Sequence, residues 1–555
     1  MGKRGIAALI GGALAIAAII GFWFWRGQPV ILVDTPGGKM ACVSYTPFRG
    51  NQTPFDQSLV IPPTQIEEDL NQLKTETDCV RIYAVNQGLD QVVPIAGKVG
   101  LKVLMGLWIG AEAADNEVQI TRGIELAKAH PDVVKAIIVG NEALLRREQT
   151  AETLAPMLRR VRTETGLPVT YADVWEFWLR YPQLANDVDF ITIHILPYWE
   201  DDPVPADQGV AHIGGILQRV ETAFPGKTIF VGETGYPSAG RQREQAVPGL
   251  IEQARFIREF LTFAHIRGLD YNVIEAFDQP WKRELEGTVG GYWGVFGENR
   301  LPKFPLQGPV SRFASPWPRV ALTLGLALLI WWPNRRGASS TSMGFATPVL
   351  AVAAGLAITL HLDHALLAAL RWHEWLVEGA LVVLSVLSAL LGLRALGTGG
   401  PQPAPARQSL EWLRRFWRAR PDAATALGAL QLLAVAAAGS VALALAFDAR
   451  YRDFPIWAFA VPTVAFALIA ARTAREARRD RIEFVFAVLL TLAALFIALN
   501  ENLFTRPELL VGVNAALQPV LHGQYNGSAL IWCAMLLILA CPFAASLFSQ
   551  RGKSR

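Results

Sequence analysis

The chain has 555 residues, of which 52% are hydrophobic and only 18% are charged. Soluble domains carry about 25% charged residues, so the composition excludes a protein that is soluble along its whole length. The net charge of +3 argues against nucleic-acid binding, and four cysteines are too few for a disulfide scaffold.

The first predicted element is an apolar helix over residues 5–25, which contain no charged side chain. At about 1.5 Å per residue, such a helix spans the hydrocarbon core of a bilayer, about 30 Å. A cleaved signal peptide is the alternative. The helix ends in four aromatic residues followed by Arg26, without a small-residue cleavage site. This ending favours an uncleaved anchor over residues 1–28.

Residues 38–310 have the composition of a soluble domain, in which short apolar runs alternate with helix-like segments. The runs predict strands at 41–45, 79–83, 102–107, 136–139, 169–172, 190–195, 228–232 and 272–276. Helices are predicted between them, among others at 64–77, 118–130, 151–165, 211–224 and 254–267. Uninterrupted apolar runs are typical of parallel strands buried on both faces. Eight such units predict an α/β fold, a (β/α)8 TIM barrel. The alternative, a doubly wound open sheet, lacks its glycine-rich loop after the first strand.

The C-terminal region predicts an all-α transmembrane bundle over residues 318–548. Seven apolar segments carry this prediction: 318–333, 344–361, 376–396, 425–447, 455–471, 482–499 and 528–548. With residues 5–25 they make eight spans. If the N-terminus is inside, the predicted inside segments hold 17 Lys and Arg residues, against four in the short outside loops (Arg371, Arg450, Arg452 and Arg506). This asymmetry predicts that both termini, including a cytoplasmic tail at 549–555, lie inside and the barrel outside.

Two cysteines, Cys42 and Cys79, each begin a predicted strand of the outer domain. An oxidising space outside the membrane would permit a disulfide between them. Small buried thiols are the alternative, and the strand positions favour the thiols.

Polar and aromatic side chains gather at the ends of the predicted strands. In a barrel these ends meet at one face, where such folds keep their active sites. The residues in strand order are Arg81, Tyr83, Trp108, Asn141, Glu142, Asp173, Trp175, His194, Tyr198, Glu233, Glu275, Asp278 and Trp281.

Two of these residues, Glu142 and Glu233, end the fourth and seventh strands and can face each other across the barrel mouth. A carboxyl pair about 5–5.5 Å apart suits retaining cleavage of a glycosidic bond. We predict Glu142 as the acid/base and Glu233 as the nucleophile, with surroundings that push their pKa values apart. Asn141 is predicted to bind the sugar 2-hydroxyl. Each glutamate alone could instead be a structural ion pair, for example with Arg81.

Aromatic side chains near the mouth can stack on the apolar faces of sugar rings. We expect about half of them to serve packing instead, and assign stacking to Trp175, Tyr198, Tyr236 and Trp281.

Four motifs resemble glycoside hydrolase family 17, the β-1,3-glucanases. They are residues 43–47 (VSYTP), 139–142 (VGNE), 231–238 (VGETGYPS), and 275–282 (EAFDQPWK) followed by 293–296 (WGVF). The resemblance covers roughly residues 40–305. It implies a (β/α)8 barrel, a retaining mechanism, a β-1,3-glucan substrate, and further substrate-binding roles for Tyr45 and Lys282. Residues 278–280 (DQP) depart from the plant pattern, which has Asn/Asp-Glu at this place.

The complete layout resembles bacterial membrane proteins called β-1,6-glucan synthases. This resemblance implies a multi-pass protein of the bacterial inner membrane whose catalytic domain lies in the periplasm. It would be a transglycosylase that moves a glucanosyl unit from a β-1,3-glucan donor to a glucan acceptor, forming β-1,6 linkages or cyclised or branched periplasmic glucans.

Two alternatives remain open. One is an endo-β-1,3-glucanase that trims the same polymer. The other is an accessory or conduit subunit of a membrane β-glucan synthase, in which the helical region carries the main function. No cofactor, metal or nucleic-acid partner is expected. The motif HLDH at 361–364 is predicted to lie in a solvated outside loop rather than to bind a metal ion.

Overall fold

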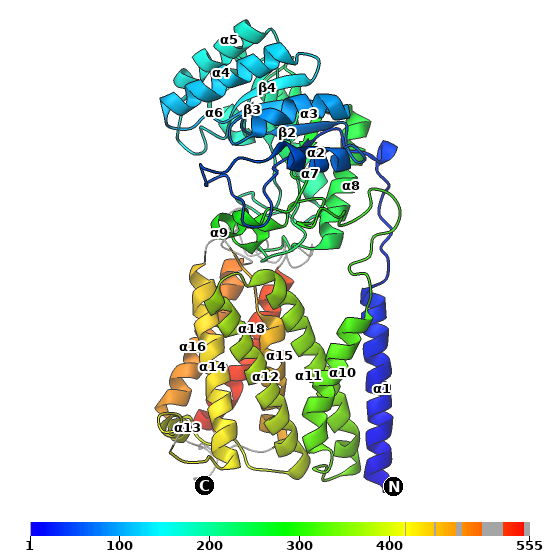
Figure 1. The fold of residues 1–555 in the computed structure, drawn as a ribbon. Coiled ribbons are helices and arrows are strands. Elements are labelled where there is room, and N and C mark those ends of the chain that lie inside the picture. Colours follow the sequence, from blue (N-terminus) through cyan, green and yellow to red (C-terminus); the bar gives the residue numbers. More distant parts are fainter. Residues whose placement is uncertain (1, 417, 449–450, 473–479, 502–525, 549–555) are drawn as a thin grey trace. The chain divides into compact units, whose positions relative to one another are not determined.

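A computed structural model describes the chain except residues 1, 417, 449–450, 473–479, 502–525 and 549–555. It contains two compact units. The first, here the barrel unit, comprises Pro29–Arg241 and Ala246–Ser311. The second, here the helical unit, comprises Met1–Gln28, Gln242–Gln245 and Arg312–Arg555. Figure 1 follows the chain through both by colour.

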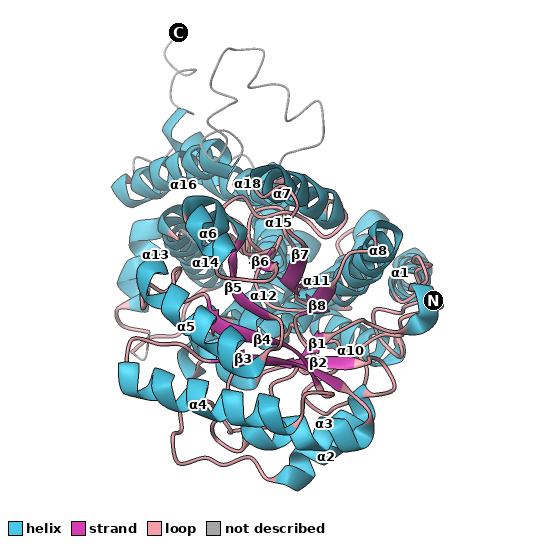
Figure 2. Ribbon diagram, turned by 90° about the horizontal axis from the view of Figure 1, so that it is seen from above, coloured by secondary structure: helices cyan, strands magenta, loops and turns pink. Residues whose placement is uncertain are grey.

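Eight parallel strands close into a barrel in the order of the sequence, and Figure 2 looks onto its strands. The strands are β1 Val43–Ser44, β2 Cys79–Ile82, β3 Lys102–Leu107, β4 Val134–Asn141, β5 Val169–Val174, β6 Ile191–His194, β7 Ile229–Thr234 and β8 Tyr271–Val273. The closing contact pairs Val43 of β1 with Val273 of β8. The predicted TIM barrel is therefore confirmed, and the open sheet is excluded.

Helices cover the barrel between the strands. They are α2 Pro63–Leu73, α3 Val92–Val99, α4 Ala113–Ala129, α5 Ala151–Thr165, α6 Trp175–Arg180, α7 Gly209–Ala223 and α8 Leu250–Arg267, with the short α9 Arg283–Glu286 after β8. The helices α2 to α8 each bury apolar side chains. In α5, Thr150 caps the first turn, and Leu154, Leu158 and Val161 are buried at helical spacing.

The barrel unit is tied at its two ends by Arg258 of α8, whose side chain is fully buried. Its guanidinium donates hydrogen bonds to the carbonyl oxygens of Leu32, Val33 and Gly308. It also pairs with Asp34 at 2.5 Å. A backbone bridge joins Val30 and Val310 beside it. The segments through which the chain enters and leaves the barrel therefore lie side by side.

The lower barrel interior contains Cys42 and Cys79, which form a disulfide. Because Val43 pairs with Val80, the two preceding cysteines lie opposite each other on neighbouring strands, with their Cα atoms 4.4 Å apart. Both side chains belong to a small buried cluster with Leu104, Ile138 and other apolar residues. The preference for two free thiols was therefore wrong, because strand register places the side chains within bonding reach.

Replacing both bridge cysteines by alanine should destabilise the barrel unit by about 4 kcal/mol. The bridge closes a loop with a sequence separation of 37 residues, and the chain-entropy relation gives this value for such a loop. The measurement is the urea midpoint at which catalytic activity is lost, with Cys541→Ala as the control because that exposed cysteine is free. Equal midpoints for the double variant and the native chain would contradict the prediction.

All eight predicted spans are helices in the helical unit. They are α1 Lys3–Arg26, α10 Trp317–Asn334, α11 Thr341–Ala368, α12 Trp372–Thr398, α14 Ala423–Phe447, α15 Ile456–Arg472, α16 Arg481–Leu499 and α18 Gly527–Phe548, with the short α13 Ala406–Leu413 in a connection. Six of them, all except α10 and α15, are long and apolar enough to cross a membrane.

The first helix is packed into the helical unit rather than attached loosely. Gly11, Ala15, Ile19 and Trp23 recur every four residues and form its buried stripe. Trp23 is fully buried and donates a hydrogen bond from its indole N–H to Thr323 of α10 at 3.2 Å. A cleaved signal peptide would leave this site on α10 and α11 empty, so the packing supports the predicted anchor.

The ends of the helices sort into two groups, as the eight-span prediction requires. At one end, Arg4 donates to the carbonyl of Ala338 between α10 and α11. The first turn of α13 contacts the start of α16, where the backbone N–H of Arg407 donates to Asp480. Both connections were predicted to lie inside. Those basic residues of the prediction that fall in 449–450, 473–479, 502–525 and 549–555 lie outside the described residues.

The opposite end holds ion pairs between helices and connections. Arg319 pairs with Asp363 at 2.7 Å, His364 with Asp453 at 2.7 Å, and His361 lies 3.2 Å from Glu378. The HLDH motif was expected in a loop, but α11 continues through it to Ala368. The two histidines lie one helical turn apart, and their partners are two different carboxylates.

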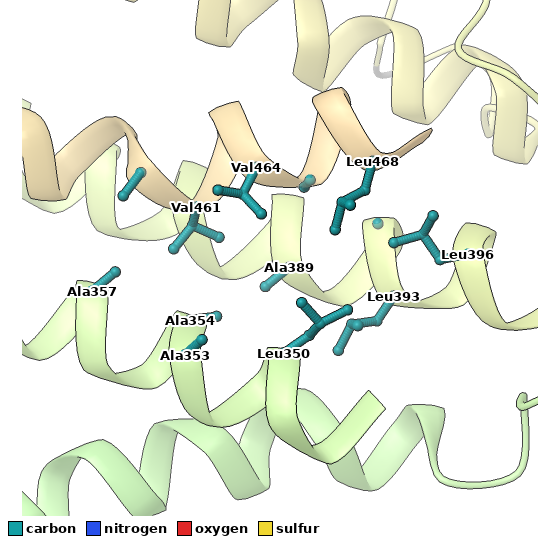
Figure 3. Close-up of a pocket in the computed structure, with 13 residues that line it drawn as sticks. Leu350, Ala353, Ala354, Ala357, Ala389, Leu393, Leu396, Val461, Val464 and Leu468 are labelled. Carbon is teal, nitrogen blue, oxygen red and sulfur yellow. The ribbon is translucent and has the colours of Figure 1, made fainter. Parts of the chain in front are cut away.

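Small side chains line an apolar crevice between α11, α12 and α15 (Figure 3). Ala354 of α11, Ala389 of α12 and Val461 of α15 face it, with Leu350 and Leu393 toward one end. Residues of this size let helix backbones approach closely, which is the usual basis of helix packing within membranes.

Candidate active site

Glu142 follows the last residue of β4, where the backbone turns sharply. Gly140 has a φ of 89° and Glu142 a φ of 52°, both in the left-handed region. A side chain at Gly140 would also meet the ring of Tyr171 at 3.2 Å. Non-glycine residues rarely adopt such a φ, and the cost of about 1 kcal/mol is typical of functional positions. The backbone of Glu142 is thus held in an unfavourable conformation at the barrel mouth.

Glu233 lies within β7, and its carboxylate converges with that of Glu142. One oxygen of each glutamate and one ring nitrogen of His194 all lie within 4.8 Å of one another. His194, the last residue of β6, lies between them: its Nδ1 is 2.8 Å from Glu142 Oε1, and its Nε2 is 3.6 Å from Glu233 Oε1. The spacing of the two carboxylates suits a retaining rather than an inverting reaction.

Arg81 of β2 organises the floor of this site and is almost completely buried. Its Nη2 donates to Asn141 Oδ1 at 2.5 Å, and its Nη1 donates to the carbonyl of Gly232 at 2.7 Å. Nη1 also lies 3.3 Å from Glu233 Oε1. One guanidinium therefore sets the positions of the residues beside both glutamates.

A chain of hydroxyl groups fixes Glu233 from the other side. Tyr83 donates its phenolic O–H to Glu233 Oε1 at 2.8 Å. The same phenol lies 2.8 Å from Ser44 Oγ, which accepts a hydrogen bond from Asn272. Burial and the charge of Glu233 raise the pKa of Tyr83 well above its ordinary value. Tyr83 therefore remains a hydrogen-bond donor to the carboxylate of Glu233.

Glu142, His194 and Glu233 are side chains of the metal-ligating kind. Here they already have partners within the protein: the guanidinium of Arg81 lies 3.3 Å from Glu233, and its Nη1 lies 3.4 Å from His194 Nε2. Because guanidinium is a permanent cation with no acceptor atom, a metal ion near Nε2 would face direct repulsion. The residues present therefore fit an organic substrate better than a metal ion.

The pKa of Glu142 lies below its ordinary value. Burial raises it, but the hydrogen bond and charge of His194, followed by the charges of Arg146 and Arg81, lower it by more. The predicted acid/base is thus held mainly ionised in the free protein. This state is the one required of a base in the second half of a retaining reaction, and the first half requires prior protonation.

A third carboxylate, Glu275, follows β8. It is fully buried, and both of its oxygens accept hydrogen bonds from Lys282 Nζ, at 2.8 and 2.9 Å. Burial raises the pKa of Glu275 from 4.5 to about 7, and the charge of Lys282 opposes this shift only in part. The charges of Glu275 and Glu233 in turn raise the pKa of Lys282 against the effect of burial.

Stability of the barrel unit should fall as the pH rises from about 5 to 8, and Glu275→Gln should flatten this dependence. The folded carboxyl binds its proton more tightly than the unfolded one, so its contribution is complete below pH 4.5 and is lost as the pH passes through about 7. The measurement is the temperature of half-inactivation across this range. Glu67→Gln, at an exposed position on α2, should keep the native slope, and an unchanged slope in Glu275→Gln would refute the assignment.

Asp173 at the end of β5 accepts hydrogen bonds from the Tyr171 hydroxyl and from the Val174 backbone. It is fully buried, and burial raises its pKa to about 6, assisted by the charge of Glu142 and opposed by Tyr171. Both oxygens of Asp173 thus accept hydrogen bonds from protein groups. Its contact with a sugar stays a prediction.

Four predicted substrate-binding residues are buried and have partners within the protein. The rings of Tyr198 and Tyr236 have no exposed surface and pack edge-to-face, 6.0 Å apart. Tyr45 is buried and donates to Asp69 at 3.1 Å. Asp278 is paired with Lys303 at 2.9 Å. The sugar contacts predicted for these four residues stay predictions, and the structure shows only that their side chains pack or pair within the protein.

The other predicted aromatic residues keep accessible surface. Trp281 packs edge-to-face against Phe48 and Phe55, with ring centroids 6.2 and 5.6 Å away. Trp175 begins α6 and is partly exposed. Trp108 after β3 is 40% exposed. These three rings can still contact a sugar.

Three residues of the site were missed as functional candidates: Ser44, Arg146 and Asn272. Arg146 donates to the backbone carbonyls of Ile109 and Asn141 and so links the loops after β3 and β4. It follows Glu142 by one helical turn, a spacing that could have been noticed. Ser44 and Asn272 act through contacts across the barrel, for which the sequence contains no signal.

Comparisons with known proteins agree with this geometry. Residues 42–294 match the family described as the BtgE/BtgC glycoside hydrolase domain. The glucan 1,3-beta-glucosidase of Saccharomyces cerevisiae is 26% identical over 264 residues, which cover 43% of this chain and 84% of that protein. The probable beta-glucosidase btgE of Neosartorya fischeri is 29% identical over 267 residues, 46% of each chain.

Among solved structures, a glycoside hydrolase family 17 β-1,3-glucanosyltransferase from Rhizomucor miehei is 23% identical, with a TM-score of 0.43. The match covers 48% of this chain and 98% of that one. An active-site mutant of the Rhizomucor miehei β-1,3-glucanosyltransferase, in complex with laminaritriose, matches with the same identity and TM-score. The barrel of this chain is therefore similar to the BtgE/BtgC glycoside hydrolase domain, and the chain is an enzyme.

Proposed function

We propose that the chain is a membrane-bound, retaining transglycosylase that acts on β-1,3-glucan. The convergence of Glu142 and Glu233 within 4.8 Å at the ends of β4 and β7 carries the proposal. The names of the similar proteins, a glucan 1,3-beta-glucosidase and a β-1,3-glucanosyltransferase, support the substrate class.

In the first step, Glu233 attacks the anomeric carbon, and the bond from that carbon to the bridging oxygen breaks. Glu142 donates its proton to this oxygen, which leaves with the rest of the chain. Tyr83 and Arg81 hold Glu233 in place. Asn141 is oriented by Arg81 and is proposed to bind the 2-hydroxyl.

In the second step, ionised Glu142 takes a proton from an acceptor hydroxyl, whose oxygen attacks the same carbon and releases Glu233. The energy of the cleaved glycosidic bond is kept in the new one, so no nucleotide is needed. A 6-hydroxyl acceptor on another glucan would form a β-1,6 branch, and one on the same glucan would form a ring.

We further propose an eight-span protein of a bacterial inner membrane, with an anchor at 1–28, a periplasmic catalytic domain at 38–310, a membrane domain at 318–548 and a cytoplasmic tail. Six helices of sufficient length and apolarity, the packing of α1 and the sorting of the helix ends support it. The disulfide between Cys42 and Cys79 is typical of an oxidising compartment. The tail lies outside the described residues.

Hydrolysis is the second candidate, because relatives such as the Saccharomyces cerevisiae protein are named glucosidases. The outcome depends on whether water or a sugar hydroxyl reaches the glucosyl–Glu233 ester first. Linkage analysis of products from the full chain in detergent, with a β-1,3-glucan donor, decides between them. Products longer than the donor with 1,6 linkages support transfer, and exclusively shorter 1,3-linked fragments would refute it.

The helical unit is proposed to bring the enzyme to a membrane β-glucan synthase that supplies the donor. Removal of residues 312–555 with retention of α1 tests this role in cells. A changed glucan structure despite normal activity of the barrel supports it, and an unchanged structure refutes it.

A further inference from the structure

Trp108 stands out among the aromatic residues of the barrel unit. It is 40% exposed, whereas the other tryptophans described in that unit are buried or only partly exposed. It directly follows β3, and its backbone N–H donates to Gln119 at 3.3 Å.

The indole of Trp108 is held in a defined orientation by Arg146. The guanidinium carbon of Arg146 lies 4.2 Å from the ring centroid and so covers one side of the ring. Glu148 accepts from Arg146 Nε at 2.9 Å and from Nη2 at 2.7 Å. The carbonyl of Ile109 accepts at 2.9 Å. A guanidinium with this many partners is immobile, so the remaining exposed surface of the indole is a preformed flat platform.

Arg146 connects this platform to the loop that carries the proposed acid/base, Glu142. Arg146 also donates to the carbonyl of Asn141, the residue before Glu142, and its charge lowers the pKa of Glu142. In the closed barrel β3 is next to β4 and four strands away from β7, which carries Glu233. Trp108 therefore lies on the side of Glu142, across the mouth from the nucleophile.

The opposite side of the mouth has its own aromatic group. Trp281, Phe48 and Phe55 pack together on the loops after β8 and β1. They lie beside Lys282, whose pKa is influenced by the charge of Glu233. One aromatic group therefore lies on the side of Glu142, and the other lies on the side of Glu233.

In retaining chemistry the acid/base contacts the bridging oxygen, so the sugar beyond that oxygen is the leaving group and, in the second step, the acceptor. We propose that Trp108, supported by Arg146, is the acceptor subsite, which stacks on a glucosyl ring and favours transfer over hydrolysis. This inference rests on the proposed function. It names one residue, Trp108, that influences whether a sugar or water attacks the glucosyl–Glu233 ester.

The test compares the native full chain with its Trp108→Ala variant, both in detergent, on two donors. The donors present the same glucosyl chain for transfer and differ in the leaving group. Laminaripentaose has a sugar leaving group, whereas β-laminaritriosyl fluoride has a leaving group of one atom. We expect kcat/KM to fall about tenfold for the pentasaccharide, the effect of losing one aromatic contact, and less than twofold for the fluoride. With the fluoride and a laminaribiose acceptor, the ratio of transfer to hydrolysis should also fall about tenfold.

Two further variants make the result specific. Trp108→Phe should restore most of the loss, because it keeps a flat ring. Ile266→Ala, which removes an exposed apolar side chain from α8, should behave as the native chain. Equal losses on both donors for Trp108→Ala would overturn the inference, because the ring would then serve the donor side or the fold.

Failure of the proposed function and failure of the subsite inference give different results. If the native chain only hydrolyses, the transfer proposal fails, while the comparison of the two donors still tests the subsite. If the native chain cleaves neither donor, the proposed function fails and the inference fails with it.

Discussion

Glu233→Gln should reduce turnover of β-1,3-glucan by at least about 10⁴-fold. The amide cannot attack the anomeric carbon, and Glu275 after the neighbouring strand is bound through both oxygens by Lys282. The effect is larger than that of an orienting contact, because a whole covalent path is removed.

The direct measurement is intact-protein mass after incubation with a 2-deoxy-2-fluoro glucosyl donor, which forms the ester and releases it slowly. The native chain should gain the mass of the sugar, and a peptide digest should locate it on Glu233. Glu233→Gln should gain nothing, whereas Glu67→Gln, at an exposed position on α2, should be labelled as the native chain. Labelling of another carboxylate would show that the nucleophile is assigned wrongly.

Glu142→Gln should lower turnover of β-1,3-glucan by about 10²–10⁴-fold, the usual range for a lost general acid. Donors with a 2,4-dinitrophenol leaving group need no proton, so formation of the ester should remain fast with them. The ester should then accumulate, because no base activates the acceptor. Added azide, which attacks without a base, should restore turnover and yield a β-glucosyl azide.

The pH dependence checks the same residue in the native chain. Since His194 lowers the pKa of Glu142 against the effect of burial, the protonated form becomes scarce as the pH rises. We expect kcat/KM for oligosaccharides to decrease as the pH rises from the acidic side. For the dinitrophenyl donor, kcat/KM should not show this decrease. Full activity of Glu142→Gln on the glucan would show that another residue is the acid.

The barrel was predictable because each strand carries its own signal. Strands buried on both faces need uninterrupted apolar runs, and β3 began and ended at the predicted residues. The helices were visible for the related reason that one face of each packs against the sheet. The order of the strand ends then brought Glu142 and Glu233 to one mouth, since a parallel barrel collects all carboxyl ends at one face.

Side-chain partners were less predictable, because they depend on contacts between distant strands. Tyr198 and Tyr236 have the sequence surroundings of a sugar platform, yet both are fully buried. Cys42 and Cys79 pair because strand register places them opposite each other, and register is not encoded in either strand alone. The HLDH motif continues a helix because α11 is longer than the apolar segment that predicted it.

The linear order of apolar and charged residues by itself determined the barrel and the apolar helices, and it placed Glu142 and Glu233 at strand ends. These features are local, since burial and helix or strand periodicity act on neighbouring residues. Only the tertiary structure decided that His194 lies between the glutamates and lowers the pKa of Glu142, and that Arg146 supports Trp108. Electrostatic and stacking interactions fall off over a few ångströms, so they depend on three-dimensional distances that spacing along the chain does not specify.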